Sequence, residues 1–105
     1  METPSKSSPI DDQAFMEQLF ATYQRLIYAV AKRTCDDPNL WGDIVQESVL
    51  RLCRYVEQLR PLTERALAMY ISVTVRYTAA DLVREAVAQR EDAERSMLDR
   101  GLTTA

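Results

Sequence analysis

Three polar side chains near the middle of the chain have the types and spacing of a docking site. Asp43, Gln46 and Glu47 lie three and four positions apart, so a helix would place them on one face beside an apolar edge. Carboxylates only accept hydrogen bonds, and such a strip can receive a basic partner surface. An ordinary solvated helix face has the same pattern. The residues alone therefore allow both interpretations, a docking site and a solvated face. A catalytic pair of carboxylates is disfavoured. Two carboxylates one turn apart on an exposed helix remain hydrated, so nothing shifts their pKa values toward acid–base catalysis.

A second set of residues mixes basic and aromatic side chains. It comprises Arg65, Met69, Tyr70, Arg76, Tyr77, Arg84 and Arg90. This mixture suits single-stranded nucleic acid, whose bases stack on rings and whose phosphates pair with arginines. However, residues 66–90 hold three arginines against Asp81 and Glu85, a surplus of only one. Tyrosines packed in a core with wet hydroxyls are the alternative interpretation.

The composition disfavours a catalytic site. The 105 residues include no histidine, the commonest general base and metal ligand. Cys35 and Cys53 have no zinc-type spacing and no adjacent base, so we expect small apolar side chains. The sequence has no phosphate-binding glycine loop. We therefore expect neither an enzyme nor a cofactor or metal.

Charge and hydropathy limit the cellular setting. A net charge of −3 argues against a polycation that binds duplex DNA regardless of sequence. No apolar run approaches the roughly 20 residues of a membrane span. Two cysteines are too few for a disulfide framework, and we expect a cytoplasmic protein without membrane contact.

These residues must be positioned by helices. Only 2 glycines and 4 prolines leave too few turn signals for an all-β fold. The prediction is an all-α fold, a compact bundle of three long helices with room for an extra short helix near residues 61–66. We expect a disordered tail over residues 1–10, the helical domain over residues 11–90, and a helix extension or linker over residues 91–105.

Caps and prolines predict where each helix begins and ends. The first helix should begin at Asp11 or Asp12 and end at the break 36–38. The second should have Asn39 as its N-cap, bury Trp41 and stop before Arg60. Thr63 should cap the third helix, and Gly101 should follow its end.

Residues 70–77 are ambiguous, because they alternate apolar and polar types and are rich in β-branched residues, which is typical of a strand. A lone strand would leave its backbone groups without partners. Leu67, Ile71, Val75 and Leu82 also fit a helical stripe. We therefore predict a helix.

Three stretches together resemble region 2 of bacterial RNA polymerase sigma factors, in particular the extracytoplasmic-function type. Residues 15–28 resemble the opening helix of that family. Residues 43–52, D-I-V-Q-E-S-V-L-R-L, resemble its signature D-L-V-Q-E-x-F-L-x-(L/A). Residues 70–84 resemble its W-L-x-x-I-A-R-N-x-x-x-D-x-x-R helix.

The resemblance implies a transcription initiation domain that docks on core RNA polymerase and recognises and melts the promoter −10 element. It implies that the largest subunit is contacted by Asp43, Gln46, Glu47, Val49, Leu50 and Cys53. It implies that the non-template single strand is contacted by Arg65, Met69, Tyr70, Val73, Arg76, Tyr77, Arg84 and Arg90. An anti-sigma protein is a further implied partner.

The chain departs from the family both in the docking motif and where DNA contacts are expected. Tyr77 replaces the usual Asn, Val49 replaces the usual Phe, and residues 85–88 lack a basic cluster. The family's region 4 is missing, so we expect an excised domain or a stand-alone module. The alternative function is a sigma-like helical module that binds polymerase or an anti-sigma protein without binding DNA.

Overall fold

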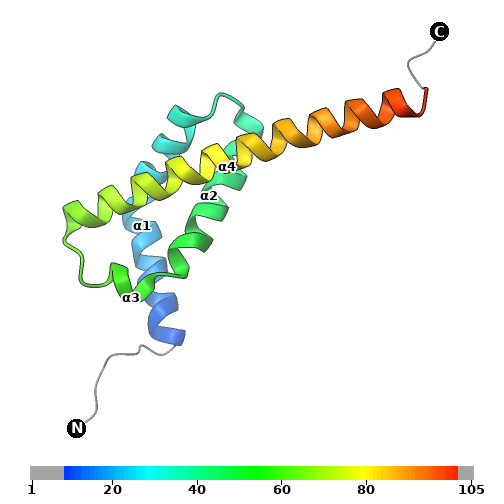
Figure 1. Cartoon of the computed structure of the whole chain (residues 1–105). Helices are drawn as coiled ribbons and strands as arrows, with labels where there is room; N and C mark the ends of the chain where they lie inside the picture. Colours follow the sequence, from blue (N-terminus) through cyan, green and yellow to red (C-terminus); the bar gives the residue numbers. More distant parts are fainter. Residues whose placement is uncertain (1–8, 102–105) are drawn as a thin grey trace.

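A computed structural model describes residues 9–101, which form helices and short connections (Figure 1). The elements are α1 (Pro9–Thr34), α2 (Pro38–Cys53), α3 (Val56–Leu59) and α4 (Glu64–Asp99). Within these residues there is no strand, and residues 70–77 are helical. The predicted all-α fold is confirmed. Of the expected N-terminal tail, residues 1–8 lie outside the described part of the chain, and residues 9 and 10 already belong to α1.

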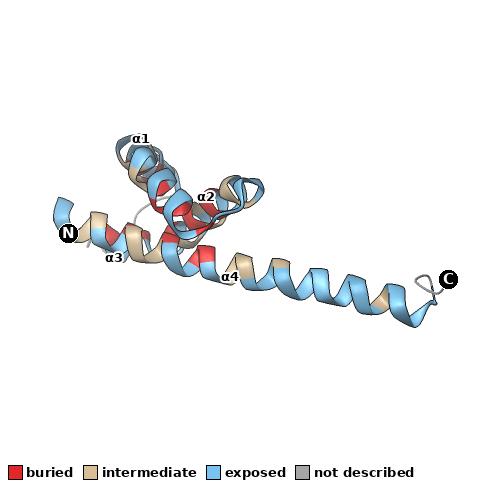
Figure 2. Ribbon diagram, turned by 90° about the horizontal axis from the view of Figure 1, so that it is seen from above, coloured by how far each residue is buried: buried red, intermediate tan, exposed pale blue. Residues whose placement is uncertain are grey.

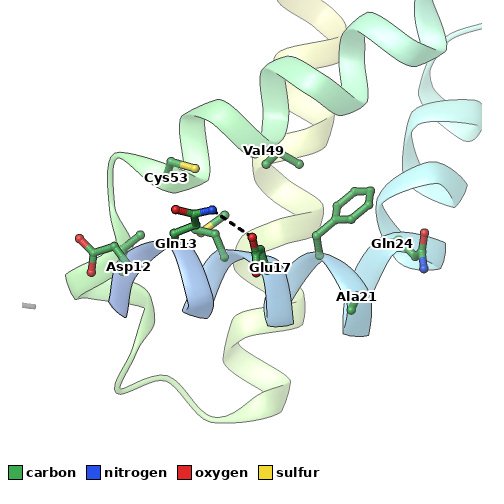
Figure 3. A pocket seen from close by; sticks show the side chains of 10 residues that line it. Asp12, Gln13, Glu17, Ala21, Gln24, Val49 and Cys53 are labelled. Carbon is green, nitrogen blue, oxygen red and sulfur yellow. Dashed lines mark hydrogen bonds between the residues drawn. The ribbon is translucent and has the colours of Figure 1, made fainter. Parts of the chain in front are cut away.

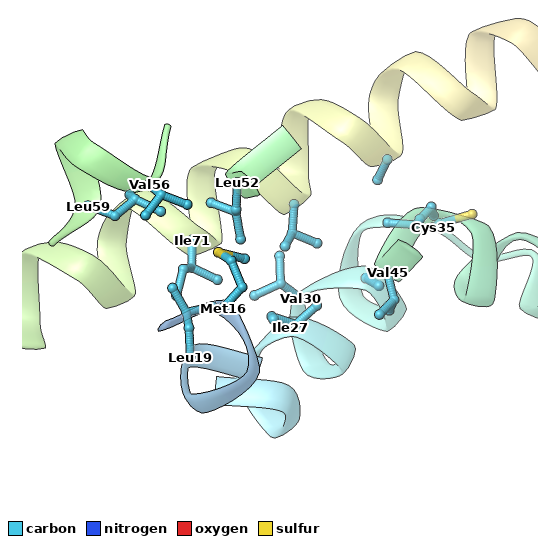
Figure 4. Close-up of a cluster of buried hydrophobic side chains, with 14 residues drawn as sticks. Met16, Leu19, Ile27, Val30, Cys35, Val45, Leu52, Val56, Leu59 and Ile71 are labelled. Atoms are coloured by element: carbon cyan, nitrogen blue, oxygen red, sulfur yellow. The ribbon is translucent and has the colours of Figure 1, made fainter. Parts of the chain in front are cut away.

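The apolar core lies where α4 packs against α1 and α2 (Figures 2 and 4). Ile27, Ile44, Leu52, Ile71 and Val75 are fully buried, and α3 adds two further buried side chains. Burial of apolar surface stabilises by roughly 25 cal/mol per Å², so these side chains hold the three long helices together. None of the described helices carries an apolar stretch long enough to cross a membrane.

Helix α2 begins differently from the prediction. Its N-cap is Asp37, whose Oδ1 accepts a hydrogen bond from the backbone N of Asn39 at 3.0 Å. The assignment of Asn39 as the cap was wrong. The physical reason is Pro38, which fits the first helical position because its fixed φ is helical and no N–H is left unpaired there.

Helix α2 also ends before the predicted boundary. The backbone N–H groups of Arg54 and Tyr55 donate to the carbonyls of Arg51 and Leu52, three residues earlier, at 3.2 and 3.0 Å. Such tighter bonds terminate the α-helical ladder. The chain then forms α3, which buries Val56 and Leu59. The extra short helix therefore lies at residues 56–59 rather than near residues 61–66.

Helix α4 begins as predicted and is the longest element. The side-chain oxygen of Thr63 accepts a hydrogen bond from the backbone N of Ala66 at 3.1 Å. After 36 residues the helix ends, and Gly101 follows with φ of 72°, a conformation that favours glycine. The first half of α4 packs on the core, whereas its last part projects from the bundle and is exposed (Figures 1 and 2). Only the first half of α4 therefore belongs to the compact bundle.

Tryptophan at position 41 fixes the connection between α1 and α2. Its ring N–H donates to the backbone carbonyl of Cys35 at 2.8 Å, and Lys32 Nζ lies 5.4 Å from the ring centre. Cys35 is buried, while Trp41 is half-buried and packs against the core. The ring therefore anchors the connection from the edge of the core.

Removal of one buried polar atom from the core should raise the free energy of unfolding measurably. Among the described residues, the fully buried Ser48 Oγ has no hydrogen-bond partner. Ser48→Ala should raise the free energy of unfolding by at least about 1 kcal/mol, because the cost of burying an unpaired hydroxyl disappears. Ser72→Ala, at a half-buried position of α4, is the control and should gain only the helix-propensity difference of roughly 0.5 kcal/mol. Urea unfolding followed by circular dichroism measures both, and a loss of stability in Ser48→Ala would contradict the prediction.

Candidate functional site

The outward face of α2 carries most of the predicted docking residues. Asp43, Gln46, Leu50 and Cys53 are exposed, and Leu50 retains 50% of its accessible surface. Within the described chain, no side chain pairs with those of Asp43 or Gln46. The face therefore combines an uncovered leucine with free acceptor groups, and Val49 borders it on the side of α1.

An apolar groove runs beside this face, between α1 and α2 (Figure 3). Its volume is about 580 Å³, and its lining includes Met16, Phe20, Val49 and Cys53. A second recess of about 340 Å³ shares Phe20 and Val49 with it. The two recesses adjoin at these side chains, and neither is lined by a lysine or an arginine of the described chain.

Glu47 does not belong to the unpaired strip. Arg51 Nε donates to Glu47 Oε2 at 3.2 Å, and Arg51 Nη1 donates to Asp81 Oδ2 on α4 at 2.9 Å. The other oxygen of Asp81 accepts from Arg84. The carboxylate that was expected to meet a partner's arginine is thus already paired within the chain. Sequence spacing could have indicated the Glu47–Arg51 pair, since the two residues are four positions apart in a helix.

These bonds fix the charge state of Arg51. Its hydrogen bond to Asp81 raises the pKa of Arg51 above the ordinary value, against the opposing effect of burial. A raised pKa in the folded state stabilises the fold at every pH below the pKa of an unfolded arginine. Loss of the Arg51 proton therefore does not break the bridge between α2 and α4 in the neutral range.

A second surface lies along the first half of α4. Exposed on it are Met69, at 64%, Tyr70, at 36%, and Tyr77, at 68%. With Val73 they line a groove of about 610 Å³, which also includes Leu62, Ala66 and Thr74. The interpretation of these tyrosines as core residues was wrong, because α4 buries its opposite side through Ile71 and Val75.

The predicted basic residues are distributed unevenly around this groove. Arg76 is exposed and lines an adjoining recess with Met69 and Val73. Arg65 is exposed one turn before Met69, so it belongs to the same side of α4. Arg84 is paired with Asp81, although its side chain is 72% exposed. Arg90 lies roughly 20 Å beyond Tyr77 along the helix, in a recess with Asp36 and Asp37. The structure thus brings Met69, Tyr70, Val73, Arg76 and Tyr77 together and leaves Arg90 apart.

The turn before α4 is held by contacts that sequence reasoning missed. Arg60 Nη2 donates to Asp12 Oδ1 at 2.9 Å, and its guanidinium lies 4.9 Å from the centre of the Phe15 ring. The hydroxyl of Tyr23 donates to the backbone carbonyl of Glu64 at 3.5 Å. These contacts tie the start of α4, and with it one end of the groove, to α1.

The arrangement is suited to binding. Within residues 9–101, no group of three or more histidine, cysteine or acidic residues could hold a metal ion. The two grooves are apolar and open to solvent, with polar groups at their margins. Such surfaces accept an apolar partner face or stacked bases.

One family model matches the chain. It is described as Sigma-70 region 2 and matches residues 19–89, which include α2, α3 and the part of α4 that packs on the core. No curated protein and no solved structure matches the chain.

The clamp on the α3–α4 turn can be tested directly. Arg60→Gln should lower the free energy of unfolding by about 1 kcal/mol, because it removes an ion pair and a cation–π contact. Hydrogen exchange of the backbone amides of Arg60 and Leu62, which donate to the carbonyls of Val56 and Leu59, should accelerate at the same time. Arg54→Gln removes an exposed arginine for which no ion pair is found within the described chain, and it should leave both measurements unchanged. Equal effects of the two substitutions would show that the Arg60 contacts do not hold the turn.

Proposed function

Because this chain belongs to the sigma-70 region 2 family, whose role is in transcription initiation, we propose that it binds core RNA polymerase through α2 and the promoter −10 element through α4. The observation that carries the proposal is the pair of uncovered surfaces on these two helices. Leu50 and Gln46 mark the first, and Tyr70 and Tyr77 mark the second. The role is one of binding, and it would be exercised in the cytoplasm.

The α2 surface has the composition of a protein interface. An apolar centre at Leu50 and Val49 is bordered by the polar Asp43 and Gln46, and the α1–α2 groove continues it. A partner helix could place an apolar stripe in such a groove. The free acceptors at its margin favour a basic partner, and we propose the coiled coil of the largest polymerase subunit. An anti-sigma protein would act by covering the same surface.

The α4 surface suits bases that have left the duplex. Stacking of a base on an aromatic ring contributes about 1–3 kcal/mol, and Tyr70 and Tyr77 present their rings beside an apolar groove. Arg76, on the adjoining recess, can pair with a phosphate. Capture of unpaired bases offsets the cost of opening the duplex, which is how this surface would favour promoter melting.

Docking is tested by placing a charge at the centre of the α2 surface. Leu50→Glu should weaken binding to core polymerase by at least about tenfold, because it buries a carboxylate where an apolar contact is expected. Leu98→Glu makes the same change at an exposed position near the end of α4 and should bind like the wild type. Binding is measured by biolayer interferometry with immobilised polymerase. Equal affinity of Leu50→Glu and the wild type would refute docking through this face.

Promoter contact is tested on the preformed complex with polymerase. Tyr77→Ala should weaken binding of a single-stranded −10 oligonucleotide about five- to hundredfold, because one stacking platform is lost. Tyr55→Ala removes another exposed tyrosine, outside the α4 groove, and should have no effect. Fluorescence anisotropy of the labelled oligonucleotide gives both affinities. Unchanged binding in Tyr77→Ala, with docking intact, would show that the DNA does not contact this groove, whereas no binding by the wild-type complex would favour the alternative of an interaction module without a DNA role.

A further inference from the structure

Four side chains of alternating charge form a line that leads from α2 to α4. Glu47 contacts Arg51, Arg51 contacts Asp81 across the helix interface, and Asp81 contacts Arg84. Glu47 is one turn from Asp43 and so borders the docking surface, while Arg84 lies on the same side of α4 as Tyr77, roughly 10 Å further along the helix. The line therefore joins the two surfaces to which the proposed function assigns different ligands.

Each inner side chain of the line, Arg51 or Asp81, has two partners in the line, whereas each outer side chain, Glu47 or Arg84, has one. Arg51 uses separate nitrogens for Glu47 and Asp81, and Asp81 uses separate oxygens for Arg51 and Arg84. The outer side chains remain accessible, with 34% exposure for Glu47 and 72% for Arg84. An external ion can thus reach either end of the line while Arg51 and Asp81 stay paired with each other.

Binding of an ion at one end of the line must change how strongly the side chain at the other end is held. A cation that binds Glu47 takes part of that carboxylate from Arg51, so Arg51 interacts more strongly with Asp81. Asp81 then holds Arg84 less strongly, because its charge is neutralised from the other side. A phosphate that binds Arg84 has the reverse sequence of effects and frees Glu47. Thermodynamic linkage requires the two effects to be equal in size.

We propose that Arg51 is a positioning residue that couples the two surfaces, so that a cationic partner group at Glu47 releases Arg84 for a phosphate. The coupling rests on the proposed function for its ligands, but the line of charges is a property of the isolated chain. In this proposal Glu47 transmits the charge of the partner because it is paired with Arg51, which an unpaired carboxylate could not do.

The coupling is tested first without any ligand. Glu47→Gln, Arg84→Gln and the double variant are unfolded in urea, in the wild-type chain and in the Arg51→Met background. Glu47 and Arg84 do not touch, yet their effects on the unfolding equilibrium constant should be non-additive by about two- to fivefold at low salt. In the Arg51→Met background the effects should be additive. The non-additivity should also vanish near about 1 M salt, where the Debye length is about 3 Å.

Matched variants keep this test decisive. Asp43→Asn removes the same charge one turn away, outside the line, and its effect should be additive with that of Arg84→Gln. If Arg51→Met does not fold, Arg51→Lys replaces it, and the coupling should fall because an ammonium cannot present the planar fork. Additive effects of Glu47→Gln and Arg84→Gln in the wild-type chain would overturn the proposal, as would equal coupling in the presence and absence of Arg51.

A second experiment links the coupling to the ligand. Glu47→Gln should raise the affinity of the chain for a single-stranded −10 oligonucleotide about two- to fivefold over Asp43→Asn, and this gain should disappear in the Arg51→Met background. An equal affinity of Glu47→Gln and Asp43→Asn would contradict release of Arg84. If no variant binds the oligonucleotide, alone or with polymerase, the DNA part of the proposed function fails, and the unfolding measurements still decide the coupling.

Discussion

The structure depends on how α2 is shared between its neighbours. One side of α2 packs between α1 and α4 through Ile44, Ser48 and Leu52, all fully buried. A helix can bury only part of its circumference in a three-helix core, so the opposite side must face outward. This places Leu50 and Gln46 in solvent while their neighbours in sequence hold the fold. The exposed face proposed for docking and the core-facing side are therefore two sides of one helix, and neither can shift without the other.

The sequence predicted the helices well because their signal is local. Apolar residues at steps of three and four identified all three long helices, and Thr63 identified the start of α4. The two boundaries of α2 were harder to predict from the sequence, because both depend on details of the backbone. Asp37 and Asn39 are both good caps, and only the position of Pro38 selects between them. The break at residues 54 and 55 has no proline or glycine to mark it.

The candidate surfaces were predicted only in part, because exposure depends on how the helices cross. Periodicity places Tyr70 and Tyr77 on a helix, but it cannot decide which side faces α1 and α2. Exposure of Tyr77 follows once Ile71 and Val75 are buried. The pairing of Glu47 shows the same limit. Its bond to Arg51 is local, whereas the bond of Arg51 to Asp81 joins residues 30 positions apart and exists only because α2 and α4 pack together.

The charge along α4 limits the kind of DNA contact that we propose for this helix. The helix holds five arginines and seven acidic residues, but residues 66–80 contain Arg76 and no acidic side chain. Apart from Glu64 in the first turn, the acidic side chains of α4 lie beyond the groove, and none of them lines it. With only Arg65 and Arg76 exposed on this side of α4 near the groove, few counterions would be released, so the affinity of the proposed DNA contact would come mainly from stacking. Stacking requires bases that are already leaving the duplex, so the proposed contact would form only where another protein holds the promoter in place. Docking through α2 would then be the step that gives α4 its access to DNA.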